Sequence, residues 1–245
     1  MSEIETNWNA LGEQDPLWAI LYDSTRKGNR WEPEAFFATG RKRIAEVMTE
    51  LADLGVTPAS TRALDFGCGV GRLTQPLASY FDRVDGVDIA RSMIEGAVAY
   101  NKCPDRCFYH HNSAENLSLF DDATFDFVYT EIVLQHIPPD LAFAFIREFI
   151  RVLRPGGIAV FDLPSGYARS VRGQVFRMVP APLLRLYRRR VHGDGTMELH
   201  VTKPAEVRSL LEREGVTMID DYDVPEVADA VIRSRQYIVE RPPPS

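Results

Sequence analysis

The sequence lacks several features that would assign it to other classes of protein. Its three cysteines are too few for a disulfide framework. No uninterrupted apolar run approaches the roughly 18 residues that cross a bilayer, and the opening "MSEIETNWNA" has neither the basic nor the apolar region of a signal peptide. Basic residues are outnumbered, and the net charge of −7 disfavours bulk attraction to nucleic acid or anionic membrane. These absences predict a cytoplasmic protein that binds neither nucleic acid nor membrane.

A group of cysteines and histidines also lacks the spacing of a structural metal site. Cys103, Cys107, His110 and His111 lie within "CPDRCFYHH", which misses the usual zinc patterns. If this stretch enters a strand, the two histidines point to opposite faces of the sheet, so that shared ligation is awkward. We therefore expect no metal.

What the sequence does have is an alternation of helix and strand patterns. The 245 residues suit one α/β domain with small additions. Apolar periodicity and end signals predict strands at 62–66, 83–89, 107–112, 125–130 and 157–164, helices at 34–54, 71–81, 92–101 and 141–153, then a helix at 204–215 and strands at 216–224 and 233–240. Because the first five strands are apolar throughout, we expect them to be parallel and buried on both faces, in a doubly wound sheet.

Two segments lie outside this alternation. Residues 1–33 are rich in aromatic residues, contain all three tryptophans, and are predicted to be irregular. The segment either folds over the site as a lid or packs on the sheet. Residues 165–203 are an insertion with a net charge of +6, which suits acceptor binding, a homodimer contact or a solvated helix. The expected single domain therefore has a lid segment, a core over 34–164, a helical acceptor-side insertion after the fifth strand, and a C-terminal helix and strands over 204–245.

The stretch "LDFGCGVGRLT" joins the first expected strand to the next helix through Gly67, Gly69 and Gly71. Glycine permits positive φ and lets a ligand touch the main chain. A phosphate loop would need Gly-Lys-Ser/Thr, and a dinucleotide loop would need glycine in place of Arg72. Asp65, at the strand end, suits a positively charged ligand better than a pyrophosphate.

This stretch resembles the first motif of class I S-adenosylmethionine (SAM)-dependent methyltransferases, Asp/Glu-x-Gly-x-Gly-x-Gly. Three further stretches are similar to that family in the same order: "VDGVDIARSM", "NSAENLSLFDDATFDFVYTEIVLQHIPPD" and "EFIRVLRPGGIAVFDLP". The resemblance is strong over residues 34–164 and weak over 200–240. It implies a Rossmann-like, seven-stranded, mostly parallel sheet and SAM as the cofactor.

The resemblance also implies a cofactor site. Asp88 would accept both ribose hydroxyls. Asn112, Ser113 or backbone carbonyls would hold the adenine, since Ser113 stands where the family usually has an acid; a plain loop turn is the alternative. The cofactor-binding residues implied are Asp65, Gly67, Cys68, Gly69, Gly71, Asp88, Ile89, Met93, Asn112, Ser113, Ala114 and Glu131.

Methyl transfer to a hydroxyl is helped by a base. His136, in "LQHIPPD", lies where resembling O-methyltransferases often use a histidine, and Asp162, at the end of the fifth strand, would orient it. The alternatives are a turn histidine that caps the next helix and a strand-end acid bonded to backbone. The residues expected to face the acceptor are Trp18, Tyr22, Glu198 and His200.

The function favoured by these observations is transfer of a methyl group to a hydroxyl of a small acceptor, a sugar first. The stretches "DPLWAIL", "LDFGCGVGRLT" and "IVLQHIPP" look similar to bacterial methyltransferases of polysaccharide and natural-product pathways, the mycobacterial enzymes that methylate mannosides being a specific case. A natural-product acceptor is the alternative. RNA methylation is disfavoured by the acidity and by the lack of a recognisable RNA-binding appendage, and the intact His136 and Asp162 disfavour a non-catalytic SAM-binding regulator.

Overall fold

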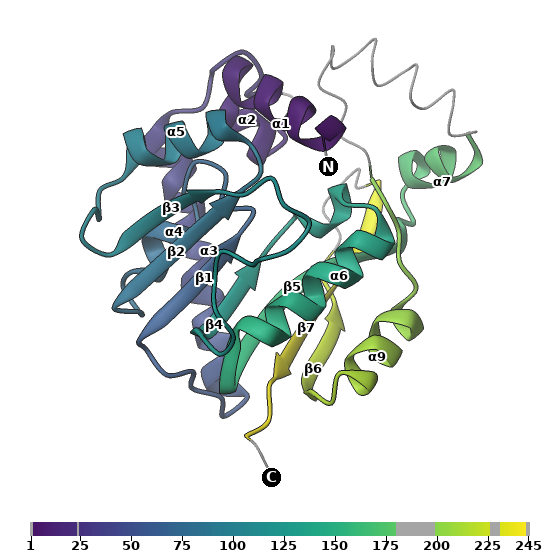
Figure 1. The fold of residues 1–245 in the computed structure, drawn as a ribbon. Helices are drawn as coiled ribbons and strands as arrows, with labels where there is room; N and C mark the ends of the chain where they lie inside the picture. Colours follow the sequence, from purple (N-terminus) through teal and green to yellow (C-terminus); the bar gives the residue numbers. More distant parts are fainter. Residues whose placement is uncertain (1, 24, 180–198, 226–230, 244–245) are drawn as a thin grey trace.

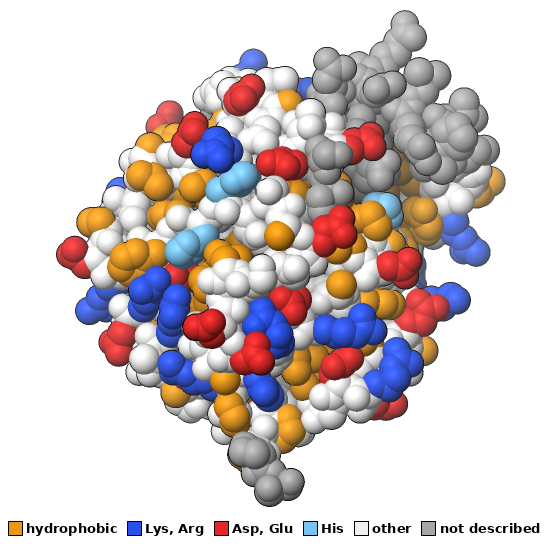
Figure 2. Space-filling model, viewed as in Figure 1, with side chains coloured by type: hydrophobic (Ala, Val, Ile, Leu, Met, Phe, Trp, Pro, Cys, Tyr) orange, Lys and Arg blue, Asp and Glu red, His pale blue; other side chains and the backbone are white. Residues whose placement is uncertain are grey.

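A computed structural model describes residues 2–23, 25–179, 199–225 and 231–243. Figure 1 shows one open sheet with helices on both faces and two further helices, α1 (Ser2–Gln14) and α2 (Pro16–Ile20), across one end of it. Acidic and basic side chains are interspersed over the face that carries α6 and α9 (Figure 2). The negative net charge of the protein is therefore not concentrated there.

Seven strands form the sheet in the order β3-β2-β1-β4-β5-β7-β6. Strands β1 to β5 are parallel, and β7 is antiparallel to both β5 and β6. Their bounds are β1 Arg62–Phe66, β2 Arg83–Asp88, β3 Cys107–His111, β4 Phe125–Thr130, β5 Leu153–Tyr167, β6 Thr217–Asp223 and β7 Ile232–Glu240. The expected doubly wound, mostly parallel sheet is confirmed. The strand order reverses between β1 and β4, where such sheets open a crevice at their carboxyl ends.

The remaining helices cover the two faces of the sheet. They are α3 Pro33–Asp53, α4 Thr74–Leu77, α5 Arg91–Tyr100, the 3₁₀ helix η1 Leu134–His136, α6 Pro139–Val152, α7 Val171–Met178 and α9 Pro204–Arg213. Helices α3, α6 and α9 each begin at a proline, which lacks the N–H that a first helical turn leaves unpaired. Helices α3, α5, α6 and α9 lie within a few residues of their predicted positions.

Successive strand residues point to opposite faces and so build two cores. In β1, Ala63 packs in the same cluster as Ile44 of α3, whereas its neighbour Leu64 packs in the cluster of Phe145 from α6. All six residues of β4 are buried, as the middle strand of a sheet covered on both faces requires. This burial holds the carboxyl ends of β1 and β4 side by side.

The prediction of irregular structure over residues 1–33 is wrong, because α1 and α2 lie there. Leu11 and Trp18 are buried in a third cluster together with Phe36 of α3 and Met93 of α5. Helices this short are stabilised by tertiary packing rather than by their own propensity. The sequence of the segment therefore carried little helical signal by itself.

The predicted helix at 71–81 is also shorter than expected. Only Thr74–Leu77 is helical. Gly71 has a positive φ of 83°, which an α-helix does not contain, so the helix begins later than expected. Helix α7 lies after β5, where the insertion was expected to be helical. The fifth strand runs from Leu153 to Tyr167 and is longer than expected at both ends.

Gly40 lies where α3 packs directly on the backbone of the glycine-rich loop. A Cβ at Gly40 would overlap with the carbonyl oxygen of Arg72, and a backbone atom cannot be relieved by rotating a side chain. Alanine is favoured over glycine in a helix by about 1 kcal/mol, yet we expect Gly40→Ala to lower the free energy of unfolding by about 1–3 kcal/mol. Urea denaturation measures this. Thr49→Ala, exposed on the same helix, should change it by less than about 0.5 kcal/mol; equal losses would contradict the packing.

Candidate active site at the carboxyl ends of the strands

The loop after β1 is closely packed at each of its three glycines. Their φ values are 73° at Gly67, 52° at Gly69 and 83° at Gly71, in the region that side chains rarely adopt. A Cβ would overlap with Val133 at Gly67, lie 2.5 Å from Ile20 Cδ1 at Gly69, and overlap with a tyrosine hydroxyl at Gly71. Backbone conformation and space both require glycine here.

Four carboxylates stand at the carboxyl ends of four neighbouring strands: Asp65 on β1, Asp88 on β2, Glu131 just after β4, and Asp162 on β5. Each was among the residues singled out from the sequence. The parallel strands bring them to one edge of the sheet, around the glycine loop. This edge is therefore the candidate site.

Asp65 is fully buried beneath the loop. The Thr74 hydroxyl donates to Asp65 Oδ2 at 2.6 Å. Burial raises the pKa of Asp65 to about 7, and the negative charges of Asp88 and Glu131 act in the same direction. A positive charge nearby would favour the ionised form, so this edge suits a cationic ligand.

Asp88 is fixed by backbone groups on both sides. Gly69 N–H donates to Oδ2 at 2.9 Å and Ala90 N–H donates to Oδ1 at 2.8 Å. Burial nevertheless raises the pKa of Asp88 above its usual range. A carboxylate has about four acceptor positions, so capacity for ligand hydroxyls remains.

Glu131 is held between two arginines that sequence reasoning missed. Arg43 of α3 donates through Nε to Glu131 Oε1, and Arg72 Nη2 lies 2.9 Å from Oε2. Burial alone would raise the pKa of Glu131, but the two guanidiniums outweigh it and lower the pKa below its usual range. Such a carboxylate is a poor proton acceptor near neutral pH. No local sequence signal indicates that Arg43, on a helix, faces the end of β4.

Asp162 holds the backbone of the loop that follows β4. Its Oδ1 accepts the N–H of Ile132 at 2.8 Å, as in the alternative of a strand-end acid bonded to backbone. Burial, and next the charge of Glu131, raise the pKa of Asp162 to about 7. Ile132 has a φ of 66°, which is strained for a β-branched residue, and it exposes 36% of its surface. Strain of this kind clusters at functional sites.

His136 closes the other side of the same loop, in η1. Gln135 Nε2 lies 3.0 Å from His136 Nε2, and the Trp8 ring of α1 meets the imidazole edge-on, with centroids 5.1 Å apart and planes at 70°. The N–H of His200 donates to the Gln135 carbonyl at 2.9 Å. The structure thus brings His200 and the N-terminal helix to η1, and sequence reasoning did not predict the contact between Trp8 and His136.

The remaining cofactor candidates have structural contacts of their own. The Ile89 carbonyl accepts from His111 Nε2 at 2.9 Å. Asn112 orders its own turn, donating to the Asn116 carbonyl at 2.8 Å and accepting from Ala114 N–H at 3.2 Å. The exposed turn residues Ser113 and Ala114 lie next to the end of β3, beside β2.

Cys68 and Met93 are buried beside the loop. Burial raises the pKa of the Cys68 thiol well above its usual value, which agrees with a small loop residue rather than a reactive one. Of the acceptor candidates on the N-terminal segment, Trp18 is buried and Tyr22 is half exposed, with the two rings 5.3 Å apart.

Part of the insertion lies outside the described residues, including Glu198 and the arginines at 185 and 188–190. Its acceptor-binding or homodimer role stays a prediction. His110 and His111 bind different partners, Asp85 and the Ile89 carbonyl. Over the described ranges, no three His, Cys, Asp or Glu side chains are arranged to hold a metal ion. Nor does any helix in those ranges have the length and apolarity to cross a membrane.

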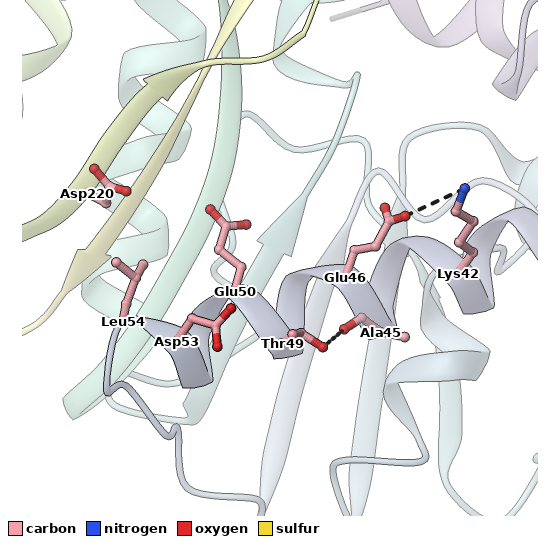
Figure 3. A pocket seen from close by; sticks show the side chains of 8 residues that line it. All are labelled: Lys42, Ala45, Glu46, Thr49, Glu50, Asp53, Leu54 and Asp220. Atoms are coloured by element: carbon pink, nitrogen blue, oxygen red, sulfur yellow. Dashed lines mark hydrogen bonds and ion pairs between the residues drawn. The ribbon is translucent and has the colours of Figure 1, made fainter.

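An open groove lies elsewhere, between α3 and β6. Figure 3 shows its lining: Glu46, Glu50 and Asp53 come from α3 and Asp220 from β6, and Glu46 pairs with Lys42 at 3.7 Å. It includes no residue from the carboxyl ends of the parallel strands. Gln236 Nε2 donates to Glu50 Oε2 at 3.2 Å, and Arg43 Nη2 donates to Gln236 Oε1. The groove is therefore linked to Glu131 through Gln236 and Arg43, but it is not part of the candidate site.

Strand-end acids, a glycine loop and this strand order define a methyltransferase domain, and comparison with known proteins agrees. Residues 64–161 match the family described as "Methyltransferase domain". The match runs from β1 to β5 and so covers the strand ends that form the candidate site.

Curated relatives are named for small-molecule methylation. A ubiquinone biosynthesis O-methyltransferase of Xanthomonas axonopodis pv. citri is 27% identical over 87% of this chain and 76% of its own length. One from Maricaulis maris is 28% identical over 64% of this chain. A 2-methyl-6-phytyl-1,4-hydroquinone methyltransferase of Synechocystis sp. is 30% identical over 62% of this chain. The matches span only 59% and 47% of the last two proteins.

Solved structures share the fold over most of the chain. Magnesium protoporphyrin IX methyltransferase from Synechocystis PCC 6803, with bound SAH, has a TM-score of 0.64 at 19% identity and covers 98% of this chain and 99% of its own. The PH0226 protein of Pyrococcus horikoshii OT3 has a TM-score of 0.60 at 23% identity, over 82% of this chain and 90% of its own. At these identities the likeness establishes the fold.

The strain at Ile132 can be measured by two substitutions. Ile132→Gly removes the Cβ that disfavours the left-handed region, whereas Ile132→Ala keeps it. We expect the glycine variant to be more stable than the alanine variant by about 1 kcal/mol, as measured by urea denaturation. Because both variants lose the isoleucine side chain, equal stabilities would show that the backbone is not strained there.

Proposed function

We propose that this protein transfers a methyl group from SAM to a hydroxyl of a small ring-bearing acceptor, with His136 as the base. The observation that carries the proposal is the position of His136. It lies on the loop between β4 and α6. In this loop the N–H of Ile132 donates to Asp162, and the side chain of Val133 packs against Gly67 of the glycine loop. The acceptor and the residue roles below are part of this proposal.

The strand-end residues fit SAM better than a phosphate ligand. SAM supplies a methyl group bound to a positively charged sulfur. Asp65 and Asp88 place negative charge at the loop, which suits a cation and opposes a phosphate. Asp88 would hold the ribose hydroxyls, with its orientation fixed by Gly69 and Ala90. The turn at Asn112 would hold the adenine.

His136 would accept the proton of the acceptor hydroxyl. Gln135 and Trp8 fix the imidazole and limit water around it. Asp162 would stabilise the imidazolium that forms, and it keeps the loop in its strained conformation. Glu131 is disfavoured as the base, since two arginines lower its pKa.

A phenolic or quinol hydroxyl is the acceptor class that the relatives support. Their printed names refer to ubiquinone biosynthesis and a hydroquinone, and no sugar appears in them. The expected sugar acceptor is thus without support from these comparisons. Physical chemistry points the same way, because a phenol has a pKa of about 10 and is more readily deprotonated by histidine than an alcohol.

An acceptor panel tests the reaction. With tritiated-methyl SAM, we expect label in 3,4-dihydroxybenzoate or a reduced quinone and none in methyl mannoside. Label found only in the mannoside would support a sugar as the acceptor and would refute a phenolic acceptor. No transfer to any hydroxyl compound would count against the proposal itself.

Asp88→Ala tests the cofactor site. It removes up to two charge-assisted hydrogen bonds to the ribose, each worth about 1.5–3 kcal/mol. We expect the affinity for SAM to fall at least tenfold, measured by calorimetry, with the protein still folded. Glu95→Ala, exposed on the adjacent α5, should leave it unchanged. Unchanged affinity of the Asp88 variant for SAM would show that Asp88 does not bind the ribose.

His136→Ala tests the base. We expect kcat to fall by about 10²–10⁴-fold with little change in SAM affinity. Asp162→Asn should lower kcat too, with less than additive effects in the double variant. The wild-type rate should rise with pH through about 6–7, as the imidazole loses its proton. Near-normal turnover of His136→Ala would leave alignment and exclusion of water as the whole mechanism.

A further inference from the structure

One face of α1 lies across the candidate site. Glu5, Trp8, Asn9 and Gly12 are spaced three and four residues apart, so they share a face of the helix. Figure 1 shows α1 beside α5, across the end of the sheet. Each of these four residues contacts either the end of a strand or a segment that follows one.

Two contacts place the helix on the cofactor side. Ser92, at the start of α5, donates through N–H to Asn9 Oδ1 at 3.1 Å and through its hydroxyl to the Asn9 carbonyl at 3.0 Å. A Cβ at Gly12 would overlap with the Ser92 hydroxyl, so the helix lies directly on α5. Glu5 lies 3.3 Å from His111 Nε2 at the end of β3. The position of α1 is thus set independently of His136.

The third contact is with the proposed base. Trp8, between these anchors, presents its ring to His136 at 5.1 Å and 70°. Aromatic rings prefer this edge-to-face arrangement. His136 belongs to a helix of only three residues, so local backbone structure does little to orient its ring.

We propose that Trp8 is a positioning residue for methyl transfer: α1, anchored at Ser92 and His111, carries the indole to His136, where it fixes the plane of the imidazole and shields it from water. This inference rests on the proposed function of His136. Trp8 acts through the histidine and needs no contact with either substrate.

A double-mutant cycle tests the inference, with 3,4-dihydroxybenzoate as the probe acceptor and tritiated-methyl SAM. Small misplacements of a catalytic group cost up to about 100-fold, so we expect Trp8→Ala to lower kcat by about 10- to 100-fold, with KM and SAM affinity changed less than about threefold. Trp8→Phe should restore most of the rate. In a His136→Ala background, Trp8→Ala should lower kcat by no more than about twofold.

Trp31→Ala is the matched control, because Trp31 packs on the same apolar cluster as Trp8 but against Phe36 rather than His136. It should leave kcat nearly unchanged. An equal loss in Trp31→Ala, or a loss from Trp8→Ala that persists without His136, would overturn the positioning role alone. Full activity of His136→Ala would overturn the base and the positioning role together.

A second measurement needs no acceptor. Diethyl pyrocarbonate acylates neutral imidazole, and mass spectrometry of peptides locates the product. If the indole shields His136, Trp8→Ala should accelerate acylation at His136, because it removes the ring that covers the imidazole, while Trp31→Ala should not. Equal rates in the wild type and in Trp8→Ala would refute the contact, whichever acceptor the enzyme uses.

Discussion

Close packing against bare backbone is the constraint on which the rest of the structure depends. The side chains of Val133, from the loop after β4, and Ile20, from α2, pack against glycines of the loop. Gly40 allows α3 to pack against the backbone carbonyl of Arg72 in the same loop. An added side chain would overlap with the packed side chains of Val133, Ile20 and Tyr109 at the loop glycines, and with the backbone of Arg72 at Gly40. Three segments distant in the chain are therefore brought together at the end of β1, and the strand-end acids stand around this point.

Charge balance is the second determinant of the site. Four carboxylates at one sheet edge repel one another, and burial adds to the cost of ionising them. Arg43 and Arg72 outweigh this only at Glu131, whose pKa is lowered. Arg72 also acts on Asp65 and Arg43 on Asp162, but burial there prevails and raises both pKa values to about 7. At this edge Glu131 is accordingly ionised, whereas Asp65 and Asp162 would be ionised more fully beside a bound cation. Such a site suits a cofactor that carries a sulfonium group.

The N-terminal helices connect the two halves of the site. Helix α1 contacts α5 and β3 on the side proposed for the cofactor and His136 on the side proposed for the acceptor. Its contacts are the packing of Leu11 and Trp8 in the third cluster, the hydrogen bonds with Ser92, and the contacts of Glu5 with His111 and of Trp8 with His136. An element of this kind opens at lower free energy than the core, as ligand exchange beneath it would require.

The sequence by itself determined the class of the protein, the parallel strands and the positions of Asp65, Asp88 and the glycine loop, because apolar periodicity, strand ends and glycine spacing are local patterns. Only the tertiary structure decided that Arg43 faces Glu131, 88 residues away in the chain, that α1 is a helix, and that Trp8 meets His136. These contacts depend on how separate elements pack, and no periodicity within one segment encodes its partner in another.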